Sequence, residues 1–438
     1  MRTLAELLPA EALRPSATVV GAGSATLGGT SRVLGREPES LVRPGSTEEV
    51  AAVLEWASRE GVGVLPIASG CRAAPIRRDP PYGDRPYVVL STERLSGIEI
   101  YEPADLTLTA GAGTPFREID RALRAERQWT PFDPPFVTEW SLGGLVAMGE
   151  SGPLWMGYGE LRNHVLGATV VTGDGRRLRL GGRVVKNVAG YDVLKTIVGS
   201  RGTLGIITSV CVRAFPEPEV DRVLVLRGAT PADLVGAACG VATAPVLPVS
   251  SVLVDGLVGE QTGPGESGAG SADRRAALVV RLHGALSTVD ADQAALERHV
   301  GSTFQPASGD DSGGVGATGL LAAIRDRAAR EPVVLDLSAR PSRLRDVLEL
   351  VAQLEPAGFV ADTYAGRMRV GLPECDAGAL RSAREAIERL GGVLRVVRDE
   401  RGNGGTQLDT PPSDHEVRLT GSLRAAFDPE GVFWPARR

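Results

Sequence analysis

The spacing of apolar residues between positions 46 and 67 predicts a helix followed directly by a strand. Ser46 and Glu49 have the spacing of a capping box, in which each side chain bonds the other residue's backbone N–H. Apolar residues recur at helical intervals up to Ala57, and Gly61 stands where a helix commonly ends. Residues 62–67 then form a short apolar run typical of a buried strand. The loop after such a strand is where α/β folds place ligands.

More elements are indicated before residue 218. Residues 87–90 and 106–110 have the composition of strands, and Thr114-Pro115 marks the start of a second helix. Two further strands, 168–171 and 177–180, are joined through Gly173-Asp174-Gly175. This turn-rich connection predicts a β-hairpin.

The pattern changes after Pro216-Glu217-Pro218, where strand-like and helix-like segments alternate. Strands are predicted at 276–282, 332–338, 367–371 and 393–397, and helices at 289–300, 341–354 and 376–390. Such alternation favours one antiparallel sheet with helices on one face, in a separate α+β domain.

Three tracts in this second half are rich in Gly, Ser, Asp and Pro and have no periodicity. They cover residues 259–275, 305–319 and 401–414, and we expect them to be mobile insertions. The last stretch, 419–435, contains the apolar turn 427–433, which should dock back onto a core.

Composition and charge exclude several classes of protein. The chain has 438 residues and 42% hydrophobic content, enough for two domains with their own cores. A net charge of −6 argues against a nucleic-acid-binding protein. The first residues lack the apolar core of a signal peptide, and no run approaches about 18 apolar residues. We therefore expect a cytoplasmic location, with at most peripheral membrane association through partners.

The cysteines Cys71, Cys211, Cys239 and Cys375 are far apart and form no CxxC pair. This spacing argues against a zinc or iron–sulfur site within the chain, and no metal is expected. Gly21 and Gly23 suggest a dinucleotide fingerprint, but the residues that follow are too rich in Gly, Ser and Thr for the required helix.

The most informative segment is 181–209, which carries Gly199, Gly202 and Gly205 around Thr203. Glycines let backbone amides approach a ligand closely, although a glycine-rich turn between two strands is an alternative. The segment resembles the FAD-binding signature of the vanillyl-alcohol-oxidase-like, PCMH-type flavoproteins. Within them, the run 186–192 is most similar to that of the FAD-binding subunits of glycolate oxidase.

The resemblance implies an α+β fold: a two-subdomain PCMH-type FAD-binding domain plus a smaller antiparallel α+β cap domain. The expected organisation is an N-terminal extension over 1–40, the FAD-binding domain over 41–218, the cap over 219–410, and a returning segment over 411–438.

Four segments in the order of the family imply noncovalent FAD binding. The implied FAD-binding residues are Ala68, Ser69, Gly70, Cys71, Arg72, Thr138, Ser141, Gly143, Gly144, Gly152, Tyr158, Gly202, Thr203, Gly205 and Ile206. Only Gly70 remains of the usual glycine cluster in the first loop, and no histidine stands there for covalent attachment. A Cβ at Gly202 or Gly205 is expected to clash with the cofactor or to strain the backbone.

Oxidation of a 2-hydroxy acid requires a base for the hydroxyl proton. Of the four histidines, His283 at the end of a predicted strand is the best candidate, while His164 is expected to be structural. Lys186 and Tyr191, within the flavin signature, are further candidates. No His-x-His pair is present, so a catalytic metal site is not indicated.

The resemblance implies an FAD-dependent oxidoreductase that works in a glycolate oxidase complex, beside a catalytic flavin subunit and an iron–sulfur subunit. Its substrate would be a small 2-hydroxy acid. Two alternatives stay open: a stand-alone dehydrogenase for a D-lactate-like 2-hydroxy acid or an alditol, and a scaffold subunit that has lost FAD.

Overall fold

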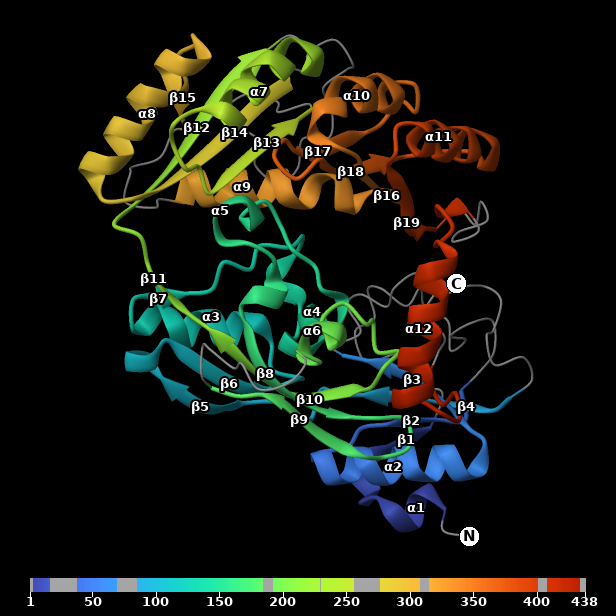
Figure 1. Ribbon diagram of the computed structural model, residues 1–438. Coiled ribbons are helices and arrows are strands. Elements are labelled where there is room, and N and C mark those ends of the chain that lie inside the picture. Colours follow the sequence, from blue (N-terminus) through green and yellow to red (C-terminus); the bar gives the residue numbers. More distant parts are fainter. Residues whose placement is uncertain are drawn as a thin grey trace.

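The computed structural model describes residues 3–15, 38–68, 85–183, 192–228, 230–255, 276–307, 315–400 and 408–433. Two bodies lie one above the other (Figure 1). The lower body contains β1 to β11 and α1 to α6, and the upper body contains β12 to β19 and α7 to α11. Helix α12 runs along one side from the upper body to the lower.

The first subdomain of the lower body is a four-stranded sheet. Its order is β1 (Leu13–Pro15), β2 (Ser40–Val42), β4 (Tyr87–Ser91) and β3 (Gly63–Ile67), with β2 and β3 parallel to β4. Helices α1 (Leu4–Leu7) and α2 (Thr47–Glu60) contact each other beside it. Ser46 caps α2 and Gly61 ends it at φ 69°, as predicted. The Glu49 carboxylate accepts from the Gly45 N–H rather than from Ser46, so the capping box is only half formed.

The second subdomain is a five-stranded antiparallel sheet. Its order is β5 (Ile98–Glu102), β6 (Thr107–Gly111), β10 (Ile206–Arg213), β8 (Val165–Val171) and β9 (Arg177–Gly181). The predicted hairpin is confirmed, because β8 and β9 pair directly. A small ribbon joins β7 (Gln128–Trp129) to β11 (Phe215–Pro216).

Short helices cover one face of this sheet. They are α3 (Phe116–Ala125), α4 (Leu142–Met148) and α6 (Leu194–Ile197), whereas the short helix α5 (Trp155–Tyr158) contacts the upper body. Ile119, Leu145 and Ile197 from three of them share one core with the strand residues Val170 and Val210. The helix predicted at Thr114-Pro115 begins one residue later, with Pro115 as its N-cap residue.

The upper body is built on an eight-stranded antiparallel sheet. Its order is β15 (Gln305–Pro306), β12 (Val220–Gly228), β14 (Ala276–Gly284), β13 (Ser250–Val254), β17 (Gly358–Asp362), β18 (Arg367–Leu372), β16 (Val333–Ser338) and β19 (Val393–Asp399). The strands predicted near β14, β16, β18 and β19 are confirmed, whereas β12, β13 and β17 were not predicted.

Helices cover both faces of this sheet, so the prediction of helices on one face is wrong. On one side lie α7 (Val235–Thr243), α8 (Leu286–Val300), α10 (Leu344–Ala352) and α11 (Ala377–Arg389). On the other side Ile324 of α9 (Val315–Arg327) packs with Val225 and Val252. The tract 305–319 was therefore partly misassigned, because its last residues begin a helix. The strands are apolar at successive positions, as expected for a sheet buried on both faces.

The C-terminal segment returns to the first subdomain after α12 (Asp414–Phe427). Val432 and Phe433 lie in the same core as Val64, and Phe433 forms a β-bridge with Val64. The Asp428 carboxylate accepts from the N–H groups of Val432 (2.7 Å) and Phe433 (2.9 Å). The apolar turn thus docks onto a core as expected, although α12 itself was not predicted. The limits 41–218 and 219–410 for independently folding units stay predictions.

Because Phe433 is 2% exposed, Phe433→Ala should leave a cavity in this core and lower the free energy of unfolding by about 3–5 kcal/mol. Urea denaturation would measure this change. Val417→Ala is the matched control on the exposed face of α12, where a change within about 0.5 kcal/mol is expected. Similar losses in both variants would contradict the docking of this segment.

Candidate functional site

Three of the four predicted flavin segments meet at the end of β3. A Cβ added to Gly202 would lie 2.7 Å from Pro66 Cγ, and one on Gly144 would lie 3.2 Å from Ala68 Cβ. The Gly199 N–H donates to the Val146 carbonyl (3.0 Å) and the Arg201 N–H to the Ala147 carbonyl (2.7 Å). The end of β3, helix α4 and the loop 199–203 therefore form one continuous surface of closely packed backbone.

The glycines of these segments are required by packing within the protein. A Cβ on Gly143 would lie 2.5 Å from Ala112 Cβ, and one on Gly152 only 1.8 Å from the Asp133 carbonyl oxygen. Gly202 has φ +73°, and a Cβ on Gly205 would meet Val170 and the Val171 carbonyl. The expectation was a clash with the cofactor or a strained backbone. At Gly202 the positive φ bears out the strain, and at both glycines the atoms that a Cβ would meet belong to the protein. Replacing these glycines cannot distinguish cofactor contact from folding.

The hydroxyls at this surface differ in what they already bind. Ser141 Oγ is buried and accepts from the Gly144 N–H, and Thr203 Oγ1 donates to the Ser200 carbonyl at 2.7 Å. Ser200 Oγ is buried and has no hydrogen-bond partner among the described residues. A buried hydroxyl without a partner is unfavourable.

The remaining predicted contacts are spread more widely. Ile206 is 2% exposed and its side chain lies in the core around Val64, while Thr138 is exposed in a 3₁₀ turn at Val137–Glu139. The other predicted residues lie outside the described part of the chain: Ser69, Gly70, Cys71, Arg72, Lys186 and Tyr191.

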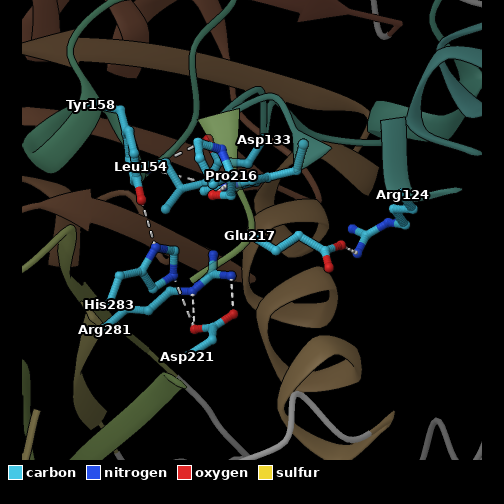
Figure 2. Close-up of polar contacts among 10 residues, drawn as sticks. Arg124, Asp133, Leu154, Tyr158, Pro216, Glu217, Asp221, Arg281 and His283 are labelled. Carbon is cyan, nitrogen blue, oxygen red and sulfur yellow. Dashed lines mark hydrogen bonds and ion pairs between the residues drawn. The ribbon is translucent and has the colours of Figure 1, made fainter. Parts of the chain in front are cut away.

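Tyr158, predicted as a cofactor contact, and His283, predicted as a catalytic candidate, are brought together where the two bodies meet. Tyr158 Oη lies 2.8 Å from His283 Nδ1, and His283 Nε2 lies 3.1 Å from Asp221 Oδ1 (Figure 2). Arg281 binds Asp221 through two nitrogens. Burial lowers the pKa of His283 and raises the pKa of Tyr158 to about 12. Both groups are therefore neutral at pH 7.

The comparisons with known proteins agree with this geometry. Residues 38–181 match the family model described as an FAD binding domain. These residues form an FAD-binding domain. The chain is 44% identical over 123 residues to the glycolate oxidase subunit GlcE of Escherichia coli, which covers 28% of this chain and 35% of that protein. It is 35% identical over 195 residues to a D-2-hydroxyglutarate dehydrogenase of Xanthomonas citri, covering 43% and 39%. The chain thus matches little more than a third of these relatives' length.

Solved structures show the fold of the whole chain. An alkyldihydroxyacetonephosphate synthase superposes with a TM-score of 0.71 at 16% identity, over 98% of this chain and 84% of that one. The fold is therefore the PCMH-type FAD-binding fold, with the eight-stranded sheet as its cap. None of the described helices is long and apolar enough to span a membrane.

A half-buried ionic cluster joins the FAD-binding domain to the cap. Arg369 on β18 binds Asp336 through two nitrogens at 2.6 Å each and Glu150 at 3.1 Å. Although burial opposes it, these carboxylates raise the pKa of Arg369 above its ordinary value. A second bridge runs from Arg367 to Glu160 (2.8 Å). Glu150 directly precedes the predicted flavin turn at Gly152, so the cap fixes the position of that turn.

Sequence reasoning missed these bridging residues. The only signal was that Arg367 and Arg369 alternate with apolar residues in a strand otherwise suited to a core. A charged residue in such a place is commonly paired.

Asp133 also binds the turn at Gly152. Its carboxylate accepts from the Leu154 N–H at 3.1 Å. Burial raises the pKa of Asp133 to about 6, although Arg281 and this N–H oppose the rise. The folded protein therefore holds the Asp133 proton more tightly than the unfolded chain does. Asp133 stabilises the fold below about pH 4, and this contribution is lost as the pH rises through about 6.

Asp133→Asn keeps an acceptor for Leu154 but cannot ionise. We expect the variant to be more stable than the wild type at pH 7 by about 2 kcal/mol, with the difference vanishing near pH 4. Urea denaturation across this range measures it. Asp105→Asn removes an exposed carboxylate and should follow the wild-type curve. A constant offset between the Asp133→Asn variant and the wild type at every pH would contradict the assignment.

Proposed function

We propose that this chain binds FAD noncovalently at the surface formed by the end of β3, helix α4 and the loop 199–203, and acts in the oxidation of a small 2-hydroxy acid. The observation that carries the proposal is the meeting of these three segments, in a domain that matches the FAD-binding family, around a Ser200 hydroxyl that has no partner among the described residues. Bound FAD would supply the acceptor for a hydride.

The residues proposed to hold FAD come from the loop that follows β3, from Ser141 to Gly144, and from Ser200 to Thr203. Backbone N–H groups and hydroxyls at these positions suit a pyrophosphate, whose charge the acidic chain as a whole would not attract. Tyr158 and Gly152 are proposed to lie toward the reactive end of the cofactor, beneath the cap.

The proposed setting is a glycolate oxidase complex with a catalytic flavin subunit and an iron–sulfur subunit. Support comes from relatives whose names are those of glycolate oxidase subunits, GlcE of Escherichia coli and GlcD of Bacillus subtilis. We also propose that the protein is cytoplasmic, contacts the membrane only through its partners, and has no nucleic-acid partner.

A stand-alone 2-hydroxy-acid dehydrogenase is the second candidate. It is favoured by the similarity to D-2-hydroxyglutarate dehydrogenase and, at 32% identity, to a D-lactate dehydrogenase of Archaeoglobus fulgidus. Two measurements distinguish the candidates. A subunit of a complex should copurify stably with a second flavoprotein and a cluster-bearing subunit. A stand-alone enzyme should give full turnover with a dye as acceptor when this chain is purified alone.

The proposed FAD site can be tested at Ser200. The purified chain should show two-band flavin absorbance, and Ser200→Ala should weaken FAD affinity about three- to tenfold through one lost hydrogen bond. The stability of the cofactor-free protein should not fall, because the hydroxyl has no described partner to lose.

Ser422→Ala, on exposed α12, is the matched control and should leave FAD affinity unchanged. Absence of flavin from the wild type would refute the proposed function. Equal FAD affinity in the wild type and the Ser200→Ala variant would place the cofactor away from this loop.

A further inference from the structure

Tyr158, His283 and Asp221 form a continuous polar chain across the junction between the FAD-binding domain and the cap. Asp221 on β12 and His283 on β14 are register partners of adjacent antiparallel strands, so their side chains share one face of the cap sheet. Arg281, two residues before His283, lies on that face as well. Tyr158 reaches this group from α5 of the other domain (Figure 2).

The charge of Asp221 selects the tautomer of His283. The Nε2–Oδ1 contact of 3.1 Å is short but poorly aligned for a hydrogen bond, so Asp221 acts on the ring mainly through its charge. A carboxylate beside Nε2 favours the proton on that nitrogen. Nδ1 is then free to accept, and the Tyr158 hydroxyl donates to it.

Arg281 keeps Asp221 ionised. Burial works to raise the pKa of Asp221, but the bonds from Arg281 and the contact with His283 hold it well below its ordinary value. A hydroxyl that donates to an imidazole backed by a carboxylate is the arrangement that serves proton transfer in many enzymes.

The exposure of the three side chains fits a path for a proton. Tyr158 is only partly buried, the His283 side chain is 4% exposed, and the Asp221 side chain is 26% exposed. Tyr158 is therefore the most readily approached of the pair, the imidazole is shielded, and the carboxylate contacts solvent at the far end. The Tyr158 ring is fixed by edge-on contacts with Trp129 (5.2 Å between centroids) and Phe215 (5.4 Å).

We propose that Tyr158 and His283 are the proton-accepting pair for the 2-hydroxy acid, and hence that the substrate is oxidised on this chain. The inference rests on the proposed function. The substrate hydroxyl gives its proton to Tyr158 Oη while the Tyr158 proton moves to His283 Nδ1. Bound FAD would accept the hydrogen of the substrate α-carbon with its electron pair, which would leave a 2-oxo acid. Tyr158 is then a neutral phenol and His283 is protonated. The resting state returns when Tyr158 Oη gives the substrate's proton to water and takes its own proton back from His283 Nδ1.

The charged groups facing the pair come from both domains. Asp221 and Arg281 face it from the cap, and Asp133 lies near Arg281 on the side of the FAD-binding domain. His283 must be unprotonated to accept, so flavin reduction should fall as the pH drops through the His283 pKa, which burial places below its ordinary value. Because the pKa of Asp133 is raised to about 6, Asp133→Asn is included, and the loss of rate at low pH should persist in that variant.

The test uses the full chain loaded with FAD and mixed rapidly with glycolate, D-lactate or D-2-hydroxyglutarate, with flavin bleaching as the signal. Tyr158→Phe and His283→Gln should each slow reduction by roughly 10²- to 10⁴-fold, and His283→Gln should lose the acid limb. The matched controls are Tyr101→Phe, whose hydroxyl binds Gln128, and His299→Gln, which lies beside Thr243 on the surface of the cap. Both controls should reduce at the wild-type rate.

A second measurement does not depend on turnover. In ¹⁵N spectra of the protein, His283 should carry its proton on Nε2 at pH 7, and Tyr158→Phe should shift the Nδ1 signal without changing FAD content. A proton on Nδ1 overturns the proposal even where a variant fails to fold.

The outcomes separate the two proposals. Two outcomes overturn the proton-accepting pair and leave FAD binding intact. In the first, flavin binds but none of the three acids bleaches it. In the second, Tyr158→Phe and His283→Gln reduce at the same rate as the controls. Absence of flavin from the wild type overturns the proposed function, and the pair with it.

Discussion

The half-buried guanidinium of Arg369 is the contact on which the relation between the two domains depends. It lies in the cap sheet, yet one of its two carboxylate partners, Glu150, belongs to the FAD-binding domain. Asp336 holds the guanidinium in place within the cap, so it is already oriented to bind Glu150. The cap is therefore held in one position over the turn at Gly152, and the pairing of Tyr158 with His283 requires that fixed position.

Close backbone packing is the second constraint. The glycines of the flavin segments are explained by neighbours in the protein: Ala112 for Gly143, Asp133 for Gly152, and Val170 for Gly205. Such packing brings the end of β3, α4 and the loop 199–203 together without side chains between them. Motif glycines can thus be required by packing within the protein itself.

The local elements could be predicted because their signals are local. The cap of α2, the β8–β9 hairpin and most strands follow from spacing and turn residues within a few positions. Helix α9 was missed because its sequence is rich in Gly and Ala and has no clear apolar stripe. Its position depends on packing against an apolar face of the cap sheet, which a local pattern does not show. The Tyr158–His283–Asp221 chain was beyond sequence reasoning as a unit, although Tyr158 and His283 were each singled out. Their meeting depends on the β12–β14 register and on the docking of two domains.

The β-bridge between Val64 and Phe433 has a consequence for how the molecule is made. The core of the first subdomain combines residues from both ends of the described chain, and the entire cap is inserted between them. During synthesis, β3 and α2 leave the ribosome long before Val432 and Phe433 exist, so this core stays open until the cap has been translated. Closure of the first subdomain therefore has to follow synthesis of the cap, and apolar surface of β3 and α2 stays exposed in the interval.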